Sequence, residues 1–179
     1  MSAFVPLMRG YKPFYIQVAS GDGKVCHDTT EWGLVARTNP YTALPNPKEP
    51  YKNDWPGEDG DDEYTAQMHY EAFEMQVGFY VKCFDFGGQT SSAMLRSQLD
   101  AFFSAIRQGE FEVFDSYTQL GFRKVRFAGY GDEEFLSRGT WACLKFSVTF
   151  KVNDPVTRMK LSSSEGASGG TVYQIVEAD

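Results

Sequence analysis

Two long stretches of alternating apolar and polar residues constrain the fold of this 179-residue chain more than any other feature. Every odd position from 73 to 83 is apolar, and so is every even position from 142 to 152. A period of two places these residues on one face of a β-strand. The two stretches therefore predict two long strands, each with one face in the core.

A single helix is predicted between these strands. Thr90 or Ser91 can cap the free N–H groups of a first helical turn, and Gly109 follows Arg107 where a helix commonly ends. Between these limits apolar residues recur at a spacing that places them on one helical stripe. The stripe consists of Leu95, Leu99, Phe102, Phe103 and Ile106.

Shorter β-prone segments surround these elements: 13–20, 24–27, 32–37, 110–115 and 122–129. The first two flank a Gly-Asp-Gly turn and predict a hairpin. An acidic turn is expected at 129–132, and Asn-Asp-Pro at 153–155 is expected to end the second long strand. Because the strands do not alternate with helices, the sequence predicts an α+β fold, a mostly antiparallel β-sandwich or split barrel with one flanking helix.

Residues 38–64 are predicted to form one long exposed loop. Five prolines remove backbone donors there, and five of the seven residues from 57 to 63 are acidic. A loop of this length inside a compact domain is uncommon, and it is usually functional or mobile.

Composition divides the chain into a β domain, 1–155, which contains the long loop, and a flexible C-terminal tail, 156–179. The stretch 162–170 is rich in Ser and Gly, whereas 171–176 is β-prone. Three alternatives are open for the β-prone peptide: it adds a strand to a neighbour's sheet edge, it frays, or it returns to its own sheet.

Charge and cysteine content narrow the class of protein. The chain has 17 Lys and Arg against 24 Asp and Glu, a formal charge of −7, which argues against a general nucleic-acid binder. Its three cysteines are an odd number without a C-x-x-C pair, which favours reduced, mostly buried thiols. Neither a signal peptide nor a membrane-length apolar run is recognisable, so we expect a soluble protein made in the cytoplasm.

Motifs for chemistry are weak, and we expect a protein that is not an enzyme and has no cofactor and no metal. His27 stands in a Cys-His-Asp run, but neighbours on a strand point to opposite faces. The G-x-S-x-G match at 166–170 lacks the strand and helix that a nucleophile elbow needs. The acidic stretch 57–63 does not have the spacing of a Ca²⁺-binding EF-hand.

A basic strip is the remaining candidate for contact with a partner. Residues 122–127 interleave basic and aromatic side chains, with Lys124 and Arg126 on one face and Arg123 on the other. On an acidic protein, such a strip is typical of a surface or intersubunit contact.

The segment 44–155 also resembles a known family. Its marks are Leu-Pro-Asn-Pro at 44–47, Asp-Trp-Pro-Gly at 54–57, the helix that closes on Gly-Glu-Phe at 109–111, and the final strand that ends in Asn-Asp-Pro. In this order it resembles the N-terminal domain of bacteriophage distal tail proteins and related tail-tube-like proteins, over about two thirds of the chain. The resemblance implies a split β-sandwich or barrel with a helix on its flank.

The function implied by the resemblance is structural. Subunits of such a protein join in a ring, commonly a hexamer, around the channel through which DNA passes in the tail of a phage or prophage. Its partners would be its own copies and other tail proteins, with DNA only in non-specific passage and no membrane. It would be located in the virion tail, as a distal tail, baseplate or tail-tube component, after synthesis in the cytoplasm of the bacterial host.

In that setting the loop 38–64 would be an intersubunit arm or a loop facing the lumen, where acidic residues let DNA slide because like charges repel. The candidate contact residues are Trp55, Glu58, Asp59, Asp61, Asp62, Glu63, Lys124 and Arg126. One departure is that the 24 residues after Pro155 are too few for the large second domain that distal tail proteins often carry.

The alternative function is that of a small carbohydrate- or ligand-binding β domain. Trp32, Trp55 and Trp141, together with the many tyrosines, would then provide a platform on which a ligand stacks.

Overall fold

The computed structural model describes residues 13–21, 23–37, 44–53, 62–63, 68–85, 87–166 and 169–178. The elements are β1 (Phe14–Ser20), β2 (Gly23–Asp28), the 3-10 turn η1 (Thr29–Trp32), β3 (Leu34–Ala36), β4 (Lys52–Asn53), β5 (Asp62–Glu63), β6 (Phe73–Phe84), α1 (Ser91–Ile106), β7 (Phe111–Asp115), β8 (Leu120–Arg138), β9 (Trp141–Glu165) and β10 (Thr171–Glu177).

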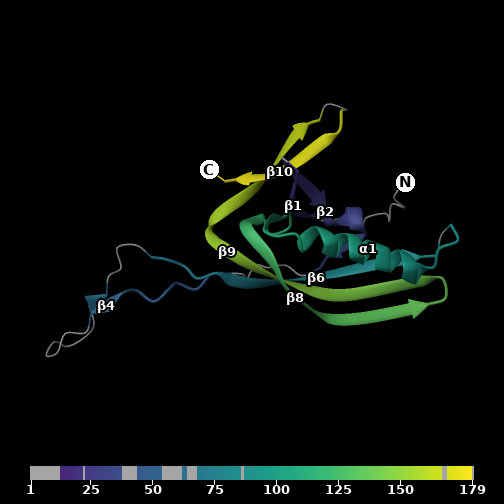
Figure 1. Cartoon of the computed structure of the whole chain (residues 1–179), viewed down its shortest axis with the longest axis horizontal. Coiled ribbons are helices and arrows are strands. Elements are labelled where there is room, and N and C mark those ends of the chain that lie inside the picture. The colour runs from purple at the N-terminus through teal and green to yellow at the C-terminus, as the bar shows by residue number, and fades with distance from the viewer. Residues whose placement is uncertain are drawn as a thin grey trace.

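The main sheet is antiparallel and open, with the strand order β2-β1-β7-β8-β9-β6-β3, and β10 pairs with β9 outside this path. The sheet curves, because the Phe14 ring on β1 lies 5.9 Å from the Phe79 ring on β6, although these strands are not neighbours in it. α1 lies along the body of the sheet (Figure 1). The predicted fold class, α+β and mostly antiparallel with one flanking helix, is confirmed.

The two alternating stretches pair with each other. β6 and the first half of β9 form a continuous antiparallel ladder from Phe73↔Val152 to Phe84↔Trp141. Because both alternate with a period of two, their apolar faces coincide and form one buried surface. Its members are each at most 3% exposed: Met75, Val77, Phe79, Val81, Cys83, Ala142, Leu144, Phe146, Val148, Phe150 and Val152.

The helix begins where predicted. The Thr90 hydroxyl accepts a hydrogen bond from the Ala93 N–H at 3.3 Å, and the Asp85 carboxylate accepts one from the Ser91 N–H at 2.6 Å. Both satisfy donors of the first turn, and the negative charge of Asp85 also suits the helix N-terminus. The predicted stripe faces the sheet: Leu95, Leu99, Phe102 and Ile106 are buried, and Phe103 is half-buried.

The predicted turn at 129–132 is wrong, because β8 continues through it to Arg138. The pairing of β8 with β9 shifts between Phe127 and Gly129 and again between Gly131 and Glu134. These bulges accommodate Asp132 at a φ of 53° within the strand. Glycines and acids that suggest a turn in a sequence thus form bulges here.

The predicted strand end at 153–155 is also wrong, because β9 runs on to Glu165. Asp154 pairs with Arg123, whereas the next pair along is Phe122↔Arg158. Pro155 therefore lies in a bulge, where no ladder bond requires the N–H that proline lacks.

The C-terminal segment returns to its own chain. β10 pairs with β9 from Thr171↔Glu165 to Glu177↔Met159, so the strand-return alternative is the one observed. Ile175 is 3% exposed and packs with Tyr15, Phe114 and Met159 in a second, smaller core. The boundary placed at residue 155 stays a prediction, although β9 crosses it without interruption.

The buried face of β6 allows a matched test of the core. We expect Phe79→Ala to lower the free energy of unfolding by about 3–5 kcal/mol, because it leaves a cavity in contact with three other aromatic rings. Phe84→Ala, on the same strand but 48% exposed, is the control and should cost less than about 1 kcal/mol. Denaturant unfolding of both variants measures the difference, and equal losses would contradict this description of the core.

Candidate assembly surface

A two-stranded ribbon leaves the body between β3 and β6 and carries β4 and β5 well away from the main sheet (Figure 1). We call its described residues, 44–53, 62–63 and 68–72, the arm. Near the body the Lys48 N–H donates to the His69 carbonyl at 2.8 Å, and the Glu71 N–H donates to the Asn46 carbonyl at 2.9 Å. Further out, Lys52 pairs with Glu63. The prediction of a loop without regular pairing is therefore wrong for these residues.

The arm exposes apolar side chains and buries none of the residues whose exposure is described. Its large apolar residues are exposed by 68% at Leu44, 75% at Tyr51, 52% at Met68 and 39% at Tyr70. A lone two-stranded ribbon is marginally stable in water, so one that also exposes several large apolar side chains favours contact with another protein. The arm thus has the chemistry of a surface that docks on another protein.

The predicted contact residues fall into three groups. Trp55, Glu58, Asp59 and Asp61 lie outside the described residues. Asp62 and Glu63 form β5, on the arm.

Lys124 and Arg126 are exposed on β8 and flank Val125, which is fully buried. Lys124 has a φ of 50° at a bulge opposite β7. β8 belongs to the body, so the structure does not bring this basic pair together with β5 of its own arm (Figure 1). The contact role of all these residues stays a prediction.

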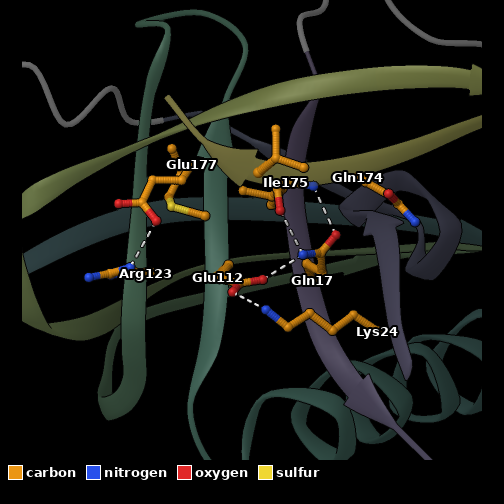
Figure 2. Close-up of a pocket in the computed structure, with 9 residues that line it drawn as sticks. Gln17, Lys24, Glu112, Arg123, Gln174, Ile175 and Glu177 are labelled. Atoms are coloured by element: carbon orange, nitrogen blue, oxygen red, sulfur yellow. Dashed lines mark hydrogen bonds and ion pairs between the residues drawn. The ribbon is translucent and has the colours of Figure 1, made fainter. Parts of the chain in front are cut away.

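The C-terminal hairpin, in contrast to the arm, is hydrogen-bonded to the body by the side-chain amide of Gln17 (Figure 2). The Gln17 Nε2 donates to the Ile175 carbonyl at 2.9 Å, and the Gln17 Oε1 accepts from the Ile175 N–H at 2.8 Å. Gln17 is 3% exposed, and it satisfies both backbone groups as a neighbouring strand would. Sequence analysis missed this residue, for which the available signal was a glutamine in the otherwise apolar run Phe-Tyr-Ile-Gln-Val.

Charged side chains surround the hydrogen bonds between Gln17 and Ile175 (Figure 2). Lys24 forms an ion pair with Glu112, which also accepts a hydrogen bond from Gln17. The Arg123 Nε donates to the Asp154 Oδ2 at 2.6 Å, and its Nη1 donates to the Glu177 Oε2 at 3.1 Å. Arg123 thereby joins β8 to both β9 and β10.

The Asp154 carboxylate is held ionised. Burial raises the pKa of Asp154, but hydrogen bonds from Arg123 and Thr157, together with the charge of Arg123, outweigh burial and lower the pKa from 3.8 to about 2. The bulge around Pro155 is thus stabilised by a charge pair as well as by hydrogen bonds.

The Cys-His-Asp run has a structural role. The His27 Nδ1 lies 2.8 Å from the Glu31 Oε2, and the Asp28 carboxylate caps the 3-10 turn by accepting from the Thr30 N–H. Burial and the nearby Glu31 raise the pKa of the Cys26 thiol to about 12, so it is not a thiolate at neutral pH.

The described residues contain no group of three His, Cys, Asp or Glu side chains placed to hold a metal ion. Within that same part of the chain, no helix combines the length and apolar character needed to cross a membrane.

Two of the three tryptophans proposed for a stacking platform take part in packing. The Trp32 ring lies 5.5 Å from the Phe102 ring and 5.0 Å from the His27 ring. The Trp141 ring is covered by the Lys82 ammonium group at 4.8 Å. Trp55 lies outside the described residues. Among the described residues, no specific observation therefore favours the carbohydrate-binding alternative.

Comparison with protein-family models gives no match, and no curated protein matches the sequence. Among solved structures, the chain is similar to the Dit protein (gp 19.1) of phage SPP1, described as a paradigm of the hub adsorption apparatus in phages that infect Gram-positive bacteria. The alignment covers 84% of this chain and 54% of the Dit chain, with a TM-score of 0.43 and 18% identity. The chain thus spans about half the length of that structure.

The two hydrogen bonds between the Gln17 side chain and the Ile175 backbone predict that substitution of Gln17 weakens the protein locally, at the C-terminal hairpin. In Gln17→Leu the N–H and carbonyl of Ile175 lose their partners, and we expect about 1–3 kcal/mol of lost stability and faster hydrogen exchange at the Ile175 amide. Gln174→Leu, at an exposed neighbouring position, is the control. Exchange at Ile175 that is equally slow in both variants would contradict the role of Gln17.

The lowered pKa of Asp154 predicts a dependence of stability on pH. Because folding favours the ionised form, this stabilisation is present above about pH 4 and is lost as the pH falls toward 2. Between these values the free energy of unfolding should fall more steeply in the wild type than in Asp154→Asn. Urea unfolding at a series of pH values tests this, with Asp100→Asn on the exposed face of α1 as the control. Parallel curves for the wild type and Asp154→Asn would refute it.

Proposed function

We propose that this chain is a structural protein of a bacteriophage or prophage tail, and that its copies form a ring around a DNA channel. The observation that carries the proposal is the arm, which projects from the body and exposes Leu44, Tyr51 and Met68 without burying them on its own chain. The resemblance of segment 44–155 to distal tail and tail-tube-like proteins points in the same direction. A curved antiparallel sheet with one flanking helix agrees with the fold which that resemblance implies.

A projecting arm favours a ring over a two-fold dimer. A contact between the arm and a different surface of the next copy is heterologous, and heterologous contacts close into rings when the rotation between copies permits. Six copies are the number that the resemblance implies. Other tail proteins would contact the faces of the ring, and the virion tail would be its location after synthesis in the host cytoplasm.

Charge supports passage of DNA without binding. The chain carries a formal charge of −7, and a channel lined by acidic residues repels the phosphate backbone. Asp59, Asp61, Asp62 and Glu63 are the residues proposed for such a lining or for contact with a neighbour, together with Trp55 and Glu58. Lys124 and Arg126, exposed on β8, are proposed as a basic contact for an acidic surface of another copy.

Size-exclusion chromatography with light scattering, followed by negative-stain imaging, tests the ring. We expect the wild type to give a large species with a central hole. The double variant Tyr51→Ser, Met68→Ser should move the equilibrium toward the single chain of 20.2 kDa, because it removes two exposed apolar side chains. The expected weakening is roughly 100-fold.

Tyr117→Ser is the matched control, since Tyr117 is 57% exposed but lies in the turn between β7 and β8, away from the arm. It should assemble as the wild type does. A wild type that stays monomeric at every concentration would contradict the ring. A double variant that assembles normally would contradict the role of the arm.

A further inference from the structure

A second exposed apolar surface lies between α1 and β8. It is a groove of about 690 Å³. Its apolar lining consists of Leu95, Leu99 and Phe103 from α1, Tyr130 and Phe135 from β8, and Leu144 from β9. Leu95, Leu99 and Leu144 are buried and form its floor, whereas Tyr130 is 42% exposed and Phe135 is 51% exposed, so the β8 side of the lining is open to solvent. We call it the α1–β8 groove.

The bulges of β8 shape this groove. They follow Phe127 and Gly131, and between them the Tyr130 ring lies 5.5 Å from the Phe103 ring of the helix. The Tyr130 hydroxyl donates to the Glu133 carboxylate at 2.6 Å, which fixes the ring relative to its own strand. Further along the strand, Phe135 lines the same groove and is half exposed.

The rim of the groove is charged. Arg96 and Arg107 lie on the helix side with Asp100, and Glu133 lies on the strand side. The Arg107 guanidinium is 5.0 Å from the Phe103 ring. Among the described residues neither arginine forms an ion pair, whereas Glu133 is occupied by Tyr130. The helix side of the rim can therefore accept acidic side chains of an occupant.

We propose that the α1–β8 groove receives the arm of a second copy of this chain. This inference rests on the proposed ring, because it requires a neighbouring copy. The arm leaves the body on the side opposite the free end of the β8–β9 hairpin (Figure 1). An arm directed away from its own groove meets the groove of another molecule, which is the heterologous geometry that a ring needs.

Length, polarity and charge match between arm and groove. α1 has 16 residues and is about 24 Å long, and an extended strand from Leu44 to Lys52 is about 30 Å long. Both surfaces expose large apolar side chains, Leu44, Tyr51 and Met68 on the arm and Tyr130 and Phe135 in the groove. Residues 44–72 contain eight acidic residues against two lysines, which complements Arg96 and Arg107 on the rim, neither of which forms an ion pair with another described residue.

A pair of neighbouring residues on β8 tests the groove. Phe135 lines it, whereas Leu136 points to the other face of the strand and is similarly exposed, 49% against 51%. Phe135→Glu places a negative charge where the acidic arm docks and should weaken assembly by tenfold or more, as a loss of the ring peak in light scattering. Leu136→Glu is the control and should assemble normally. Thermal unfolding of both variants verifies that each remains folded.

Mixing experiments identify the occupant. The arm variant Tyr51→Ser, Met68→Ser keeps an intact groove, and Phe135→Glu keeps an intact arm. Each alone should be monomeric, and an equimolar mixture should form a dimer of one copy of each, because one complete interface remains. That dimer would support the proposal, and a mixture that stays monomeric would overturn it.

The failures of the two proposals are distinguishable. If the wild type forms rings and Phe135→Glu forms them equally well, the groove assignment is overturned while the ring stands. If Phe135→Glu leaves the ring intact but abolishes binding of another tail protein, the occupant is that protein, and the assignment is again overturned. If the wild type does not self-associate, the ring itself is refuted.

Discussion

The pairing of β6 with β9 is the interaction on which the rest of the molecule depends. Its ladder from Phe73↔Val152 to Phe84↔Trp141 brings two alternating sequences into register, so that their apolar faces form one surface. A shift of one residue in either strand would turn its whole apolar face to solvent. α1 then covers this surface, with the Phe102 ring 5.5 Å from the Phe79 ring. Both the projecting arm, which enters β6, and the α1–β8 groove, which has Leu144 of β9 in its lining, take their positions from this pair.

Two hairpin-like segments project from the body, and they differ in how they are held. The C-terminal hairpin has Ile175 buried, both backbone groups of that residue bonded to Gln17, and the Glu177 carboxylate paired with Arg123. The described part of the arm is bonded across its own two strands and exposes its apolar side chains. The first segment is complete within one chain, whereas the second has the character of one half of an interface. This contrast is the physical basis of the proposed assembly.

The sequence predicted the elements whose signals are local and missed those that depend on distant partners. The stripe Leu95, Leu99, Phe102 and Ile106 faces the sheet as expected, because helical spacing alone decides which residues share a face. The glycines near 129 and Pro155 suggested breaks, because both residue types disfavour regular pairing. In the structure each lies at a bulge opposite β9 or β8, where the ladder tolerates it. Such a position is a property of two strands together and is invisible in either one. Of the candidate site, the sequence located the exposed segment 38–64 but not its ribbon form, and it did not indicate the groove.

By itself, the sequence determined the fold class, the two long strands, the single helix and the faces that they bury, because periodicity is written into consecutive residues. Only the tertiary structure decided that β9 continues beyond Pro155, that Gln17 holds Ile175, and that Tyr130 and Phe135 border an open groove. Each of these depends on residues far apart in the chain: Gln17 and Ile175 are 158 positions apart. Contacts at such separations leave no periodic signal in a single sequence, since only folding brings the two partners together.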